Sequence, residues 1–175
     1  ARAYTIKVFY FAPDSQKKGL NEEAEIAMER ALSLDPKLAE AHLARGLILW
    51  TPARRFPHEE AVRAYRQALA LDPGLDEAHH QLAVVLFHVG LLDKSQAEIE
   101  KALAINPGNT LARFRLGVIA MYRGEYERAY EVFNSTPLER SPSLWAFQTG
   151  TALFRLGRER EAVELIDRFL RDYPR

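Results

Sequence analysis

A small side chain recurs along this chain at nearly constant intervals, and this recurrence constrains the fold more than any other feature of the sequence. The small residues, spaced by 37, 34, 34 and 33 positions, are Ala24, Ala61, Ser95, Ala129 and Ala162. Four positions after each of them stands a large residue, and these are Met28, Tyr65, Ile99, Phe133 and Ile166. A pattern with this period is typical of proteins built from stacked copies of one short unit.

The segment 76–107 shows most clearly what the repeated unit is. It reads as two short amphipathic helices, 77–89 and 93–105, that are joined at Gly90. A second set of mostly small residues recurs in the first helix of each unit, at Gly46, Ala83, Gly117 and Gly150. Because small residues let two helices approach closely while large ones fill the adjacent space, the pattern predicts a stack of helical hairpins, each ended by a proline-containing turn.

This pattern resembles the tetratricopeptide repeat, a helix-turn-helix of 34 residues with small, large and proline positions at these offsets. The resemblance covers a degenerate first repeat and four full ones, at residues 1–38, 39–75, 76–109, 110–142 and 143–174. It implies an all-α fold, a right-handed solenoid of antiparallel hairpins with nine or ten helices, as a single array over residues 1–175.

The sequence departs from the family pattern at a few places. Three extra residues lie within 51–57, and histidines, His42 and His79, replace the aromatic residue that the family usually has early in the first helix. Pro137 should end the second helix of its repeat near position 135, because proline lacks the amide hydrogen that a helix interior needs. Residues 3–12 have some strand propensity, but we expect a helix there because a lone strand would have no partner.

Composition narrows the classes of function. The 24 basic residues cancel the 24 acidic ones, so the chain lacks the positive field that nucleic acids require. The absence of cysteine excludes disulfides and thiolate metal sites. No apolar run reaches the roughly 20 residues that cross a bilayer, and no signal peptide is evident. We therefore expect a cytoplasmic protein.

Because the chain starts without methionine, we expect a piece of a longer protein, and similar arrays often accompany signalling domains in bacteria.

Catalytic motifs are lacking. We find no glycine-rich phosphate loop, no Gly-x-Ser-x-Gly elbow and no His-Glu-x-x-His sequence. The five histidines are His42, His58, His79, His80 and His88. His80 and His88 lie two helical turns apart, which is too far for a metal-binding pair at i and i+4. We therefore predict that the chain is not an enzyme and that it binds neither a metal nor a cofactor.

A binding groove is implied by the resemblance. In tetratricopeptide arrays the first helix of every hairpin lines a concave groove, and the family binds peptides there. The corresponding positions in this sequence are Leu43, Leu47 and Trp50; His80, Val84, Phe87 and His88; Phe114, Arg115, Val118, Met121 and Tyr122; and Phe147, Thr151, Phe154 and Arg155. Most of these residues are apolar or aromatic, and soluble proteins rarely leave large contiguous apolar patches open without a function.

The function that we predict is a non-catalytic protein-interaction module whose groove binds an apolar or amphipathic peptide or helix. A clamp for acidic chaperone tails is disfavoured, because Leu43, Leu47 and Leu111 stand where that clamp needs cations or amides. Three alternatives stay open. The aromatic residues could be additional core, the last helix at 159–172 could form a homodimer, and the array could bind single-stranded RNA, which the zero net charge disfavours.

Overall fold

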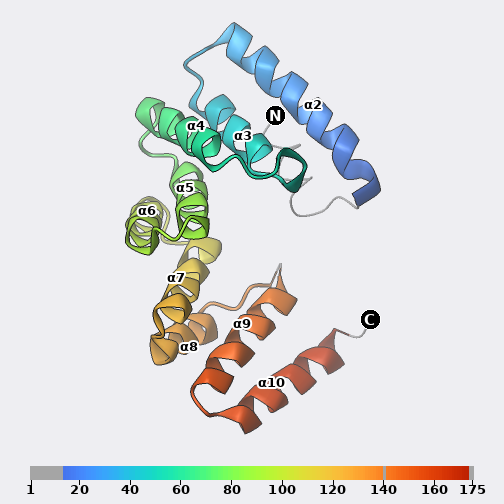
Figure 1. The fold of residues 1–175 in the computed structure, drawn as a ribbon, viewed down its shortest axis with the longest axis vertical. Coiled ribbons are helices and arrows are strands. Elements are labelled where there is room, and N and C mark those ends of the chain that lie inside the picture. Colours follow the sequence, from blue (N-terminus) through green and yellow to red (C-terminus); the bar gives the residue numbers. More distant parts are fainter. Residues whose placement is uncertain (1–13, 140, 174–175) are drawn as a thin grey trace. The chain divides into compact units, whose positions relative to one another are not determined.

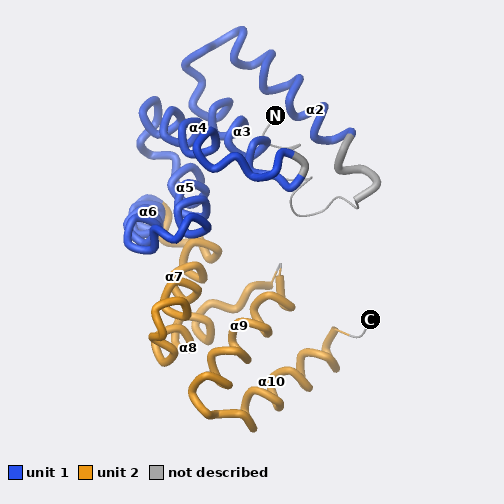
Figure 2. Tube along the Cα trace, in the orientation of Figure 1, with its two compact units in different colours: residues 1–105 blue, residues 106–175 orange. Residues whose placement is uncertain are grey.

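The regular secondary structure of the chain is helical throughout the residues that the structure, a computed structural model, describes, namely 14–139 and 141–173 (Figure 1). The chain divides into two compact units, Ala1–Ile105 and Asn106–Arg175 (Figure 2). The all-α prediction is confirmed for these residues. The predicted helix at 3–12 lies outside them.

The helices pair as hairpins within each unit. Unit 1 contains α2 (Asp14–Leu34), α3 (Ala39–Leu49), the short 3-10 helix η1 (Pro52–Arg54), α4 (His58–Leu71), α5 (Asp76–His88) and α6 (Leu92–Ile105). Unit 2 contains α7 (Thr110–Arg123), α8 (Tyr126–Ser135), α9 (Pro142–Arg155) and α10 (Glu159–Asp172). The closest packing joins α3 to α4, α5 to α6, α7 to α8 and α9 to α10.

In three of the hairpins, a large side chain of the second helix packs on a glycine of the first. Tyr65 lies over Gly46, and Phe133 lies over Gly117; both rings are fully buried. A methyl group added at Gly117 would stand 2.5 Å from Cε1 of Phe133, closer than two carbon atoms can approach. The small and large positions of the sequence pattern are therefore the contact points of the hairpins.

The turns between hairpins explain the recurring Asp-Pro and Asn-Pro pairs. Side-chain oxygens of Asp72 and Asn106 accept hydrogen bonds from the backbone amides two residues further on, at 2.9 and 3.1 Å. This is the local hydrogen bond by which Asp and Asn stabilise turns. Asp35 makes the same bond, at 2.9 Å, to the amide of Lys37.

A hydrogen bond to each turn explains why the first helices lack the family's aromatic residue. Histidine rings six residues after two of these prolines approach the carbonyl oxygen of the proline: His42 Nε2 lies 2.9 Å from that of Pro36 and His79 Nε2 lies 3.3 Å from that of Pro73. Arg113 makes the equivalent bond to the Pro107 carbonyl, at 2.5 Å. The polar residues thus fasten the start of each hairpin to the turn that precedes it.

The two irregular connections are also fastened. Arg54 in the 51–57 insertion forms an ion pair with Glu25 of α2 at 2.6 Å. In unit 2, α8 ends at Ser135, as Pro137 predicted. The indole nitrogen of Trp145 donates to the carbonyl of Phe133 at 2.8 Å, and the same carbonyl accepts from the amide of Thr136 at 3.2 Å, so the end of α8 is bonded to the start of α9.

Candidate protein-binding face

Seven of the predicted groove residues lie buried in the fold, so for them the structure differs from the predicted open groove. They are Leu43, Leu47, Trp50, His80, Val84, Phe114 and Val118, each at most 8% exposed. The reason is that the first helices are enclosed on more than one side: on α5, nine consecutive residues from Ala78 to Leu86 are buried. These seven side chains therefore belong to the packed interior of the fold.

The other predicted groove residues stay accessible. Phe87, Arg115, Met121 and Thr151 are half-buried, whereas His88, Tyr122, Phe147, Phe154 and Arg155 are exposed. Three of the exposed side chains are large aromatics in unit 2, with exposed fractions of 70% for Tyr122, 64% for Phe147 and 61% for Phe154. The open part of the predicted groove is therefore concentrated in unit 2.

The exposed apolar residues of α9 and the half-buried Thr151 follow a helical stripe. Leu144, Phe147, Thr151 and Phe154 are spaced by three, four and three residues, which places them on one side of a helix. We call these four residues the α9 aromatic face. Leu144, which is 43% exposed, was missed by the sequence analysis. The sequence could have indicated Leu144 through its position, one helical turn before Phe147 on the same side of the helix.

The flank of α9 next to this face is already occupied. Gly150 and Leu153 are buried, and Ile166 of α10 packs against the backbone at Gly150, with its Cδ1 placed 3.3 Å from where a β-carbon would stand. Figure 1 shows α9 and α10 as an antiparallel hairpin. Because the core contacts of α9 are complete on this side, the α9 aromatic face is additional apolar surface.

The C-terminal end of α9 lies beside the turn between α7 and α8. The guanidinium group of Arg155 stands 6.0 Å from the ring of Tyr126, the first residue of α8. Tyr122 is in the last turn of α7, directly before that connection. Tyr122 and Phe154 therefore lie at the same end of unit 2.

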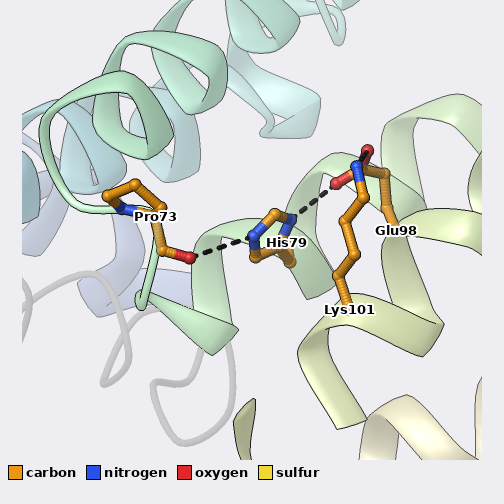
Figure 3. A network of polar contacts seen from close by, with 4 residues as sticks. All are labelled: Pro73, His79, Glu98 and Lys101. Atoms are coloured by element: carbon orange, nitrogen blue, oxygen red, sulfur yellow. Dashed lines mark hydrogen bonds and ion pairs between the residues drawn. The ribbon is translucent and has the colours of Figure 1, made fainter. Parts of the chain in front are cut away.

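A polar network in unit 1 has the residue types of an acid–base site but is used for structure (Figure 3). His79 of α5 donates through Nδ1 to the carboxylate of Glu98 of α6 at 2.6 Å, and its Nε2 faces the Pro73 carbonyl. Lys101 donates to the same carboxylate at 2.8 Å. Each polar atom of this network faces a partner within unit 1, so the network ties α5, α6 and the preceding turn together.

The network predicts an acid-sensitive contribution to stability. Burial alone would raise the pKa of Glu98, but hydrogen bonds from Lys101 and His79 lower it below its usual 4.5. Because the pKa is lower in the folded chain, the stabilisation is complete above pH 4.5 and is lost as the pH falls through the lowered value. Glu98→Gln should reduce the free energy of unfolding at pH 7 by about 1–2 kcal/mol.

Urea unfolding of the wild type and Glu98→Gln at pH 7, and again well below pH 4.5, measures this difference. The difference should shrink at the acidic pH. The exposed neighbour Glu100 provides the control substitution, Glu100→Gln. A difference that stays constant with pH would contradict the assigned role of the Glu98 carboxylate.

Groups that could hold a metal ion are absent from the part of the chain that the structure describes, where no three His, Asp or Glu side chains are suitably arranged. None of the helices in the described ranges is long and apolar enough to cross a membrane.

Comparison with known proteins agrees with the geometry. Family models match at four places: the one described as TPR repeat covers residues 58–90, and those described as tetratricopeptide repeat cover 15–38, 80–144 and 146–175. A search of the curated proteins found no significant match.

Solved structures with the same fold include three that the chain matches over most of its length. MamA is 22% identical with a TM-score of 0.70, over 90% of this chain and 92% of MamA. PilF of Pseudomonas aeruginosa is 20% identical with a TM-score of 0.76, over 99% of this chain and 77% of PilF. YrrB, described as a TPR protein with an unusual peptide-binding site, is 22% identical with a TM-score of 0.65, over 87% of this chain and 79% of YrrB.

The hairpins and their small-to-large contacts define the class as an all-α helical-repeat protein. The chain belongs to the tetratricopeptide repeat family, and its fold is a tetratricopeptide solenoid. Repeats of this family indicate a protein–protein interaction module.

Proposed function

We propose that this chain is a non-catalytic interaction module that binds an apolar or amphipathic segment of a partner protein in unit 2. The binding surface consists of the α9 aromatic face and Tyr122 of α7. The observation that carries the proposal is the exposure of three large aromatics, each above 60%, beside a hairpin core that is complete without them. Peptide binding is also named for YrrB, which has the same fold.

We expect the three aromatic anchors to supply enough affinity for specific binding. Burying one aromatic side chain contributes about 1.5–3 kcal/mol before the costs of ordering and association are subtracted. Three such anchors, with the half-buried Met121 and Thr151 around them, are consistent with a dissociation constant on the order of micromolar. Aromatic anchors surrounded by smaller contacts are the usual source of affinity at protein interfaces.

Removing two of the anchors tests the proposal. A random library of peptides of about 16 residues, long enough for a helix to span the α9 aromatic face, is selected on the immobilised chain. For peptides recovered on the wild type, Phe147→Ala with Phe154→Ala should weaken binding at least about tenfold, measured by fluorescence anisotropy. Because both rings are exposed, the free energy of unfolding should change by less than about 0.5 kcal/mol for each.

A matched control removes comparable apolar surface from another helix. Val163 and Leu170 of α10 are 59% and 54% exposed, so Val163→Ala with Leu170→Ala should leave peptide binding unchanged. If the control weakens binding as much as the aromatic pair does, or if the aromatic pair has no effect, the proposed surface is wrong.

Self-association is a second candidate function, favoured by the same exposed residues of α10. Val163, Leu170 and Tyr173 form an apolar edge on the last helix, each more than half exposed. A homodimer through this edge would bury it. Light scattering over a concentration series tests this candidate, because a dimer should become monomeric in the Val163→Ala, Leu170→Ala variant, whereas a wild type that is monomeric at all concentrations excludes it.

A further inference from the structure

Charge is divided unevenly between the first and second helices of unit 2. The first helices, α7 and α9, contain four arginines and no Asp or Glu: Arg113, Arg115, Arg123 and Arg155. The second helices, α8 and α10, contain seven acidic residues and four arginines. The exposed aromatics Tyr122, Phe147 and Phe154 therefore belong to the two helices whose charge is entirely positive.

Three arginines of the second helices and of the turn before α10 are paired with carboxylates within the chain. Arg128 pairs with Glu125 at 3.0 Å, Arg158 with Glu161 at 2.7 Å, and Arg160 with Glu164 at 3.2 Å. These are short-range pairs along the surface of one helix or its first turn. The acidic residues of unit 2 thus compensate arginines on and next to the second helices.

Arg155 differs from these three arginines because its neighbour is an aromatic ring and not a carboxylate. It follows Phe154 directly, is exposed, and contacts the neutral ring of Tyr126 at 6.0 Å. Among the described residues no carboxylate lies within ion-pair distance of its guanidinium group. A contact with an aromatic ring holds the guanidinium in place but does not cancel its charge. A fixed positive charge therefore stands at the edge of the α9 aromatic face.

We infer that the partner segment is an acidic amphipathic helix, with carboxylates beside its apolar anchors; this inference rests on the proposed function. The α9 aromatic face spans about 15 Å along one side of a helix, which suits a second helix lying alongside it. Carboxylates on the partner then meet Arg155 at one end of the face. A basic partner would bring like charges together, which electrostatic complementarity disfavours.

The apolar anchors distinguish this partner from an acidic tail held by its carboxylates. The α9 aromatic face carries no lysine or asparagine, and its four members are Leu144, Phe147, Thr151 and Phe154. Affinity therefore comes mainly from the apolar contacts, and the carboxylates contribute selectivity, a faster association rate and a dependence on salt.

The charge of the selected peptides tests the inference. In the random peptide library described above, we consider the peptides that bind the wild type but not the Phe147→Ala, Phe154→Ala variant. They should contain more Asp and Glu than Lys and Arg. For one such labelled peptide, Arg155→Glu should weaken binding about fivefold at low salt and reduce its salt dependence. Arg160→Glu, on α10, is the matched control and should have no effect.

Each outcome decides between the two proposals. Peptides that depend on Phe147 and Phe154 but are neutral or basic on average would overturn the acidic partner and leave the binding surface in place. Equal binding by Arg155→Glu and the wild type would do the same. A selection that yields no peptide dependent on these two residues would overturn both the surface and the partner.

Discussion

Phe114→Ala should lower the free energy of unfolding by about 3–5 kcal/mol, whereas Phe147→Ala should lower it by less than about 0.5 kcal/mol. The two phenylalanines occupy the same position of successive repeats, 33 residues apart. Phe114 is 3% exposed and its ring lies 4.7 Å from that of Phe133, while Phe147 is 64% exposed. Truncating Phe114 leaves a cavity in the core of unit 2, and truncating Phe147 removes atoms from water-exposed surface.

Chemical denaturation followed by circular dichroism measures both values under one condition. The comparison is well controlled because the side chain, the helix position and the substitution are identical. If both variants lost similar stability, Phe147 would be part of the core and the α9 aromatic face would not exist as an open surface. If neither lost stability, the burial of Phe114 would be wrong.

Gly117→Ala should lower the free energy of unfolding by about 3 kcal/mol, although alanine normally stabilises a helix relative to glycine by about 1 kcal/mol. The added methyl carbon would stand 2.5 Å from Cε1 and 2.8 Å from Cδ1 of the fully buried Phe133. The ring has no open space to enter, so α7 and α8 must separate. The same substitution at Gly46 meets Tyr65 in the same way.

Gly150→Ala is the matched comparison, because Gly150 occupies the equivalent position of the next repeat. There the nearest atom is Cδ1 of Ile166 at 3.3 Å, the end of a flexible side chain that can move by a few tenths of an ångström. We expect the free energy of unfolding to change by less than about 1 kcal/mol, because the higher helix propensity of alanine offsets the close contact with Ile166. Thermal unfolding of the two variants tests this, and equal destabilisation by both would contradict the packing of Phe133 on Gly117.

The fold was predictable because its signal is repeated. Single small or large residues carry little information, but the pairs Gly46 with Tyr65 and Gly117 with Phe133 recur in different hairpins, 19 residues apart where the three extra residues of 51–57 intervene and 16 apart without them. The end of α8 at Ser135 was also predictable, because Pro137 stands where the repeat pattern would otherwise continue the helix. These features depend on contacts inside one hairpin, where the distance along the chain is short.

The extent of the open surface was not predictable in the same way. The repeat places Phe114 and Phe147 at the same position, yet their burial depends on which neighbours each one meets. Phe114 meets the ring of Phe133, whereas the residue that corresponds to Phe133 in the next hairpin is the smaller Ile166, which packs at Gly150. The burial of these side chains depends on packing between helices, and the spacing of the sequence repeat does not predict it.

The polar substitutions in the first helices carried a signal that the sequence alone could not interpret. His42 and His79 mark a departure from the family's aromatic residue, but only the structure shows the acceptor that they share with Arg113, the carbonyl of the preceding proline. The constant separation of six residues was visible in the sequence. A search for donors at a fixed distance from each turn would have found it.

Hydroxyl-radical footprinting of the intact chain, with and without a peptide recovered by the selection, tests the central claim most directly. The account predicts that the bound peptide protects Phe147, Phe154 and Tyr122, which are exposed in the free chain. Exposed residues of α10, such as Leu170, should remain equally reactive. Protection confined to α10 or to unit 1, with Phe147 and Phe154 still fully reactive, would contradict the claim that the open aromatic surface of unit 2 binds the partner.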